Sequence, residues 1–167
     1  MIKIALSILL SVLHVQALKL AVINDIHLNP KLEDSCSLWP PQLCYTLGVY
    51  GTDTPVPLFE AILENIKGQH ENPDAILISG DFVVHGLASK NHTYNNWSEM
   101  KIIINQALSL IQAHFPDTPI LPNIGNNDVL HHYQAPNSTE KAMYYGDLYD
   151  IWFSEVLANK QNTTKIL

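Results

Sequence analysis

Three short polar segments of this chain carry residue types that bind metal ions. They are Asp25–His27, Gly80–His85 and Gly125–Asp128, and each lies just after an apolar run. Together they offer carboxylate oxygens, imidazole nitrogens and an amide oxygen, which suit hard or borderline divalent cations. Two such cations about 3.5–4 Å apart can clamp a displacement at phosphorus and generate hydroxide near neutral pH. The segments therefore indicate a dinuclear metal site suited to hydrolysis at phosphorus.

The residues of these segments differ in what they can contribute. Asp25 and His27 are two positions apart, so both can reach one cation if the chain turns after a strand. Asp81 follows a glycine that lets the backbone bend, and its two carboxylate oxygens can bridge two cations. Asn126 offers a neutral amide oxygen to the second cation. The alternative is that the aspartates only cap helices or form turns. However, three such segments, each with metal-binding residue types just after an apolar run, rarely arise by chance.

The stretches between the polar segments supply the elements that must position them. Short, partly β-branched runs at 18–23, 75–79 and 120–124 are predicted to be buried strands. Apolar residues at helical spacing predict helices over 57–68, from about 98 to 115, and over 140–160. Alternating strands and helices are typical of an α/β fold with parallel strand pairing. Ligands of such sheets bind at the carboxyl ends of the strands, where all three segments lie.

Taken in this order, the three segments resemble the motifs of the calcineurin-like metallophosphoesterases. Asp25–Pro30 and Ile120–Asn126 also resemble the secreted acid sphingomyelinase-like phosphodiesterases. The second and third segments are similar to the endopolyphosphatase branch of that group. The resemblance covers about residues 18–152 and implies the N-terminal half of the α/β sandwich of that family.

The resemblance implies a ligand set. Asp25 and His27 would bind the first metal ion, Asp81 would bridge both ions, and Asn126 would bind the second. Zn is the expected metal, with Fe or Mn as alternatives, because Asp, His and Asn ligands fit all three. His85 matches a histidine that lies behind the metal ligands or faces the substrate in relatives. Relatives add a lone histidine and a His-x-His pair from the C-terminal half, so we expect this chain to be truncated before those ligands.

Asn127 departs from the family pattern. The family has a histidine at this position, which is thought to assist the leaving oxygen, whereas an amide cannot act as a general acid. We therefore expect a preference for good leaving groups, such as phosphoanhydrides, over alkyl phosphodiesters. His131 or His132 could replace the missing proton donor, although an exposed loop histidine is the commoner case.

The first 17 residues have the pattern of a secretory signal peptide. Lys3 precedes an apolar run over 4–13, and Val15–Ala17 has the small-x-small form of a cleavage site. The run is too short for a stable bilayer anchor, so we expect no membrane span after cleavage. An uncleaved anchor or a buried N-terminal strand is the alternative. Residues 18–167 would then form the partial phosphoesterase domain, located outside the cell or in a lysosomal or vacuolar lumen.

Two further features agree with export. The two cysteines, Cys36 and Cys44, can close a small loop as a disulfide in an oxidising compartment, with free thiols as the alternative. Four Asn-x-Ser/Thr triplets are potential glycosylation sites. Their acceptor residues are Asn91, Asn96, Asn137 and Asn162.

The charge of the chain restricts the classes of molecule that it can bind. Nine basic and sixteen acidic residues give a formal charge of −7, which leaves no basic stripe for a nucleic-acid backbone. The expected partner is a phosphate-ester or phosphoanhydride substrate. The sequence thus predicts a secreted metal-dependent phosphoric ester hydrolase with a dinuclear centre, acting on a lipid phosphodiester, a nucleotide or polyphosphate. The alternative is a catalytically inactive secreted glycoprotein that keeps half of the fold.

Overall fold

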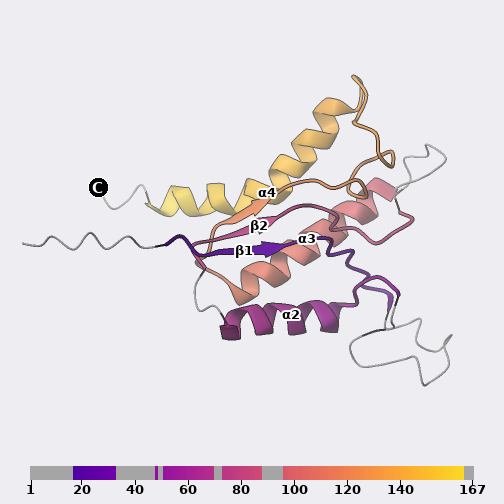
Figure 1. The fold of residues 1–167 in the computed structure, drawn as a ribbon. Coiled ribbons are helices and arrows are strands. Elements are labelled where there is room, and N and C mark those ends of the chain that lie inside the picture. The colour runs from indigo at the N-terminus through magenta and orange to yellow at the C-terminus, as the bar shows by residue number, and fades with distance from the viewer. Residues whose placement is uncertain (1–16, 33–47, 49–50, 70–72, 88–95, 164–167) are drawn as a thin grey trace, which may run out of the picture.

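The protein alternates strands and helices along the chain. A computed structural model describes residues 17–32, 48, 51–69, 73–87 and 96–163, with side chains up to residue 153. Figure 1 shows the elements in their chain order. They are β1 (Leu20–Ile23), α2 (Val56–Gln69), β2 (Ala75–Ile78), α3 (Trp97–His114), β3 (Ile120–Pro122) and α4 (Lys141–Thr163).

The three strands form one parallel sheet in the order β1-β2-β3. Val22 pairs with Leu77, and Leu77 pairs in turn with Leu121. Parallel neighbours require long crossover connections, and α2 and α3 lie within these connections. All three strands therefore end at the same edge of the sheet, which confirms the α/β fold with parallel pairing. Each strand and helix predicted from the sequence has its counterpart within a few residues.

The core lies between one face of the sheet and the helices. Ala21 and Ile23 of β1 and Ile76 and Ile78 of β2 are buried there. Helix α3 contacts both α2 and α4, which lie on opposite sides of the molecule (Figure 1). The buried side chains of α3 recur at helical spacing. They are Trp97, Met100, Ile103, Ile104, Ala107 and Ile111.

The opposite face of the sheet is more exposed than the sequence predicted. The run over 18–23 was expected to be mostly buried, but burial in β1 alternates along the strand. Leu20 is 45% exposed and Val22 58% exposed, and Leu121 of β3 is 52% exposed. Successive side chains of a strand point to opposite faces, and among the described residues the helices bury only one of these faces.

A network of polar contacts fixes α4 against α3. The indole Nε1 of Trp97 and the ammonium of Lys101 both donate to Asp147 Oδ2, at 2.7 and 2.8 Å. The hydrogen bond from Lys101 is the main reason that the pKa of Asp147 lies below its ordinary value. The ring of Tyr144 packs on Trp97. These contacts hold the first turns of α4 against the start of α3.

Several predictions concern parts of the chain outside this description. The signal peptide over 1–17 falls there except for its last residue, as do Cys36, Cys44 and Asn91. Asn96 directly precedes α3 and donates from Nδ2 to the carbonyl of Leu87. Asn137 is exposed just before α4, and Asn162 lies in α4 beyond the described side chains. Among the described residues, no helix combines the length and the apolar character needed to cross a bilayer.

Candidate metal centre

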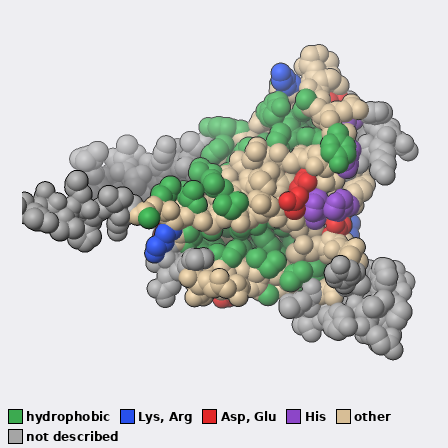
Figure 2. Space-filling view, viewed as in Figure 1, with side chains coloured by type: hydrophobic (Ala, Val, Ile, Leu, Met, Phe, Trp, Pro, Cys, Tyr) green, Lys and Arg blue, Asp and Glu red, His purple; other side chains and the backbone are tan. Residues whose placement is uncertain are grey.

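The first two polar segments lie together at the carboxyl ends of β1 and β2. Backbone hydrogen bonds continue the pairing beyond the strands, because His27 N donates to Asp81 O and Leu28 N donates to Phe82 O, both at 2.8 Å. Figure 2 shows histidine and acidic side chains gathered at the end of the molecule toward which β1 points in Figure 1. Segments more than fifty residues apart in sequence therefore share one site.

The backbone takes an uncommon conformation at all three expected ligands of the first cation. Asp25, His27 and Asp81 have positive φ angles of 49°, 41° and 54°. This left-handed region is sparsely populated by residues other than glycine and costs on the order of 1–3 kcal/mol per residue. The surrounding backbone hydrogen bonds hold these turns in place. The strained turns direct the three side chains toward one another.

The geometry around His27 suits a metal ligand. Nδ1 of His27 lies 3.0 Å from the carbonyl oxygen of Val83, which can only accept, so Nδ1 carries the proton. The lone pair is then on Nε2, which lies 4.0 Å from Asp25 Oδ1 and 3.8 Å from Asp81 Oδ2. All three ligand atoms lie within 4.8 Å of one another. Histidines that bind metals commonly donate their second nitrogen in this way.

Asp81 also connects the second polar segment to the third. Its Oδ1 accepts a hydrogen bond of 2.8 Å from the backbone N–H of Asn127. A Cβ atom on Gly125 would overlap the Asp81 carboxylate, and one on Gly80 would overlap the backbone of Gly125. The two glycines therefore allow the close approach that places the Asp81 carboxylate against the third segment.

Asp128 supports the site instead of facing it. The side chain is fully buried, with Oδ1 accepting from Phe82 N at 2.8 Å and from Val83 N at 3.1 Å. Oδ2 accepts from Gly125 N at 2.8 Å. Burial raises the pKa of Asp128, and these backbone hydrogen bonds oppose that effect. This carboxylate fastens the second and third segments to each other.

The two asparagines of the third segment occupy different surroundings. Asn126 is half-buried, and its Nδ2 lies 3.4 Å from Nε2 of His132. A donation from Nδ2 to His132 leaves the Oδ1 of Asn126 for a cation. Asn127 is only 2% exposed, and its Oδ1 has no hydrogen-bond partner among the described residues. A buried, unpaired acceptor is costly, and a donor or cation at the site would offset that cost.

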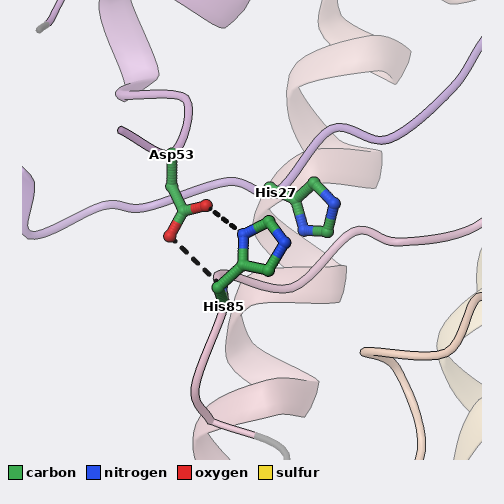
Figure 3. Close-up of side chains that lie close together, drawn as sticks. All are labelled: His27, Asp53 and His85. Carbon is green, nitrogen blue, oxygen red and sulfur yellow. Dashed lines mark hydrogen bonds and ion pairs between the residues drawn. The ribbon is translucent and has the colours of Figure 1, made fainter. Parts of the chain in front are cut away.

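His85 lies beside His27 and brings in a residue that the sequence reasoning missed. The two imidazole rings are stacked, with centroids 3.9 Å apart. His85 Nδ1 contacts Asp53 Oδ1 at 2.5 Å, as Figure 3 shows. Asp53 is placed by Thr54, which pairs with the backbone of His27 and Asn29. The one signal for Asp53 was its position within residues 29–57, where five prolines indicate a long loop. Long loops in compact domains are often functional.

The donor set therefore fits a divalent cation. Two carboxylates converge on an imidazole nitrogen whose tautomer is fixed, and Asp25, with 70% of its side chain exposed, leaves the site open to solvent. The structure brings Asp25, His27, Asp81 and His85 together, and it places the third segment against Asp81 through the backbone of Asn127.

Comparison with known proteins identifies the family. The sequence model of the calcineurin-like phosphoesterases matches residues 18–167. The chain belongs to the calcineurin-like phosphoesterase family. The family resemblance and the α/β fold expected from the sequence are both confirmed, and membership of a metallophosphoesterase family implies divalent metal ions.

Curated relatives narrow the branch of this family. Sphingomyelinase phosphodiesterase D of Dictyostelium discoideum is 29% identical over 113 residues, which are 68% of this chain and 23% of the relative. Sphingomyelinase phosphodiesterase C of the same organism is 35% identical over 83 residues, or 50% of this chain and 18% of the relative. The mouse acid sphingomyelinase-like phosphodiesterase 3b is 27% identical over 141 residues, which are 78% of this chain and 29% of the relative. The match thus spans less than a third of each relative.

Proposed function

We propose that this calcineurin-like phosphoesterase contributes a dinuclear metal centre to the hydrolysis of phosphoric diesters. Asp25, His27 and Asp81 would hold the first cation, and Asp81 with Asn126 would hold the second. The observation that carries this proposal is the position of the His27 Nε2 lone pair within 4.0 Å of two carboxylates. A cation bound between these three side chains would offset the cost of the strained turns that bring them together.

The residues of the chain would divide the work. A bound cation supplies positive charge that polarises a phosphoryl oxygen. The carbonyl of Val83 keeps His27 in the tautomer that binds metal, and Asn127 N orients the Asp81 carboxylate. The exposed ring of His85, 61% of which is open to solvent, stands beside this centre and can contact substrate.

The names of the relatives support a phosphodiester as the substrate class. The three relatives described above are named as sphingomyelinase or acid sphingomyelinase-like phosphodiesterases. We therefore propose a phosphodiester substrate, Zn as the preferred metal with Fe or Mn as alternatives, and a location outside the cell or in a lysosomal or vacuolar lumen. Asn127 further favours substrates with good leaving groups, including phosphoanhydrides.

Metal titration of the full chain tests the centre directly. We expect Zn²⁺ or Mn²⁺ to bind with release of heat, and Asp81→Asn to weaken binding by about 10-fold or more because a charged ligand becomes neutral. Hydrolysis of bis-p-nitrophenyl phosphate should fall in parallel. Asp74→Asn is the matched control, because Asp74 is an exposed carboxylate that accepts from Lys19 N. Equal metal binding by the wild type and by Asp81→Asn would contradict the proposal.

A second candidate function rests on Asn127. Because an amide replaces the histidine of the family, the chain could keep metal binding and lack turnover, as an inactive secreted glycoprotein would. Metal binding without hydrolysis of either bis-p-nitrophenyl phosphate or a nucleoside triphosphate would support this candidate over the enzyme.

A further inference from the structure

The two neighbouring histidines that follow the third polar segment lie in different surroundings. His131 is buried, and its Nε2 lies 3.2 Å from Oε1 of the buried Glu140. His132 is half-buried, and its Nε2 lies 3.4 Å from Nδ2 of Asn126. One histidine therefore anchors this loop in the protein, and the other contacts the residue proposed to hold the second cation.

The carboxylate of Glu140 is fixed at the start of α4. Its Oε1 accepts from Nδ2 of Asn137 at 2.5 Å, and its Oε2 accepts from the backbone N–H of Asn137 at 3.1 Å. Oδ1 of Asn137 accepts in return from the backbone N–H of Glu140 at 3.2 Å. This reciprocal pairing is a capping box, which satisfies backbone N–H groups at a helix N-terminus. Glu140 is therefore a rigid partner for His131.

The turn that carries His132 is tight and strained. The N–H of Gln134 donates to the carbonyl of His131 at 2.8 Å, and Tyr133 within this turn has a positive φ of 60°. Such a conformation costs on the order of 1–3 kcal/mol for a residue other than glycine, and it persists only where the surrounding structure imposes it. The ring of Tyr133 also packs on that of His132, with centroids 4.2 Å apart. The anchored turn therefore holds the His132 ring beside Asn126.

The contact with His132 matters because the two ends of the Asn126 side-chain amide have opposite chemistry. Oδ1 can bind a cation, whereas Nδ2 can only donate hydrogen bonds. Half a turn about the last side-chain bond exchanges these two ends with little change in shape. A ring nitrogen with a lone pair attracts Nδ2 and repels Oδ1. It therefore selects the orientation that leaves Oδ1 for the cation.

We propose that His132 is a positioning residue, whose Nε2 accepts from Asn126 Nδ2 and thereby directs Asn126 Oδ1 at the second cation. This inference rests on the proposed function, in which Asn126 is a ligand of that cation. The proton of the neutral His132 ring then lies on Nδ1. The buried pair of His131 and Glu140 acts one step further away, by placing the turn that carries His132. His132 itself contacts neither the substrate nor the cation.

Mn²⁺ binding to the full chain, followed by electron paramagnetic resonance, tests the proposal, because two neighbouring Mn²⁺ ions give a coupled spectrum that a single ion does not. We expect His132→Ala to weaken binding of the second ion about 10-fold, a loss typical for removal of a group that orients a metal ligand. Binding of the first ion should not change. His132→Gln keeps an acceptor oxygen for Nδ2 and should recover most of the affinity. The matched control is His114→Ala on α3, where the histidine ring contacts Leu110 and Glu64.

Glu140→Gln tests the support behind His132. A neutral amide holds His131 less firmly than a carboxylate does, so affinity for the second ion should fall about 2- to 5-fold. In a His132→Ala background, Glu140→Gln should have no further effect on this affinity. A further loss in that background would show that the pair does not act through His132.

The tautomer of His132 can be read in the metal-free protein, independently of the proposed function. Histidine ¹⁵N spectra, recorded at a pH where the ring is neutral and assigned with His132→Gln, should show the Nδ1–H tautomer. A ring protonated on Nε2 would donate to the amide oxygen of Asn126 and hold it away from the cation. That tautomer would overturn the proposal.

The metal titrations separate this inference from the proposed function. A coupled Mn²⁺ spectrum in the wild type that is unchanged in His132→Ala would overturn the positioning role and leave the proposed function intact. A loss that His132→Gln does not restore would also overturn the positioning role, by making the ring itself a metal ligand. A wild type that binds no second Mn²⁺ ion would overturn the proposed function, and this inference with it.

Discussion

Backbone groups orient the side chains of this centre as much as the side chains orient one another. The Val83 carbonyl fixes the tautomer of His27, and the N–H of Asn127 orients Asp81. Asp128 uses both oxygens on backbone N–H groups from two different segments. The motif residues thus fall into two groups, one that faces the site and one that builds it.

Asp128→Asn tests this division at the residue scale. The substitution turns one acceptor into a donor that faces a backbone N–H, so a buried hydrogen bond is lost. We expect the free energy of unfolding to drop by about 1–3 kcal/mol, as measured by urea denaturation. Asp25→Asn, at an exposed carboxylate, should change stability by less than about 0.5 kcal/mol. Equal effects of the two substitutions would show that Asp128 does not have the supporting role described above.

Among the elements, the contact between α3 and α4 depends on a polar cluster. Trp97 and Lys101 on α3 both donate to Asp147 on α4. Tyr144, also on α4, donates from its hydroxyl to the backbone carbonyl of Asp128 at 2.9 Å. Helix α4 therefore connects α3 to the third polar segment.

Asp147→Asn tests this cluster by its pH dependence. The pKa of Asp147 is lowered in the folded state, mainly by the hydrogen bond from Lys101. Its contribution to stability is thus complete above the ordinary value of 3.8 and is lost as the pH falls through the folded pKa. We expect the variant to lose up to about 1 kcal/mol at neutral pH, and the difference from wild type to shrink in acid. Thermal unfolding measured from neutral pH to below pH 3 checks this, and a constant difference would refute it.

At the scale of the whole molecule, helices bury only one face of the sheet within the part of the chain that the structure describes. Ile23 is 7% exposed, whereas its neighbour Val22 is 58% exposed. Helices α2 and α3 lie in the crossover connections between the strands and also pack against the buried face. The same two helices therefore align the strand ends and build the core.

Matched substitutions in β1 test this one-sided burial. Ile23→Ala removes buried methyl groups and should cost about 2–4 kcal/mol of stability. Val22→Ala should cost less than about 1 kcal/mol, because most of that side chain is already in contact with solvent. Chemical denaturation of both variants compares them directly. Similar costs would mean that the second face of the sheet is also covered in solution.

The sequence alone was enough to predict the order of strands and helices and the gathering of polar segments at the strand ends. Both follow from local patterns, since apolar periodicity marks the elements and polar residues after a strand mark the edge where ligands bind. Asp53 could not be found in this way, because its role depends on a pairing of Thr54 with His27 that no local pattern encodes. The exposure of Val22 escaped prediction too, because an apolar run does not show which of its faces a helix covers.

The sequence by itself determined which chemical groups are present and at which edge of the sheet they gather. Only the tertiary structure decided which of them meet. The tautomer of His27, the stacking of His85 and the support from Asp53 arise from contacts between segments 25 to 60 residues apart. Such contacts depend on close packing of the folded backbone. Gly80 and Gly125 allow this packing because neither has a Cβ atom to keep the two segments apart. A linear pattern carries no information on these distances.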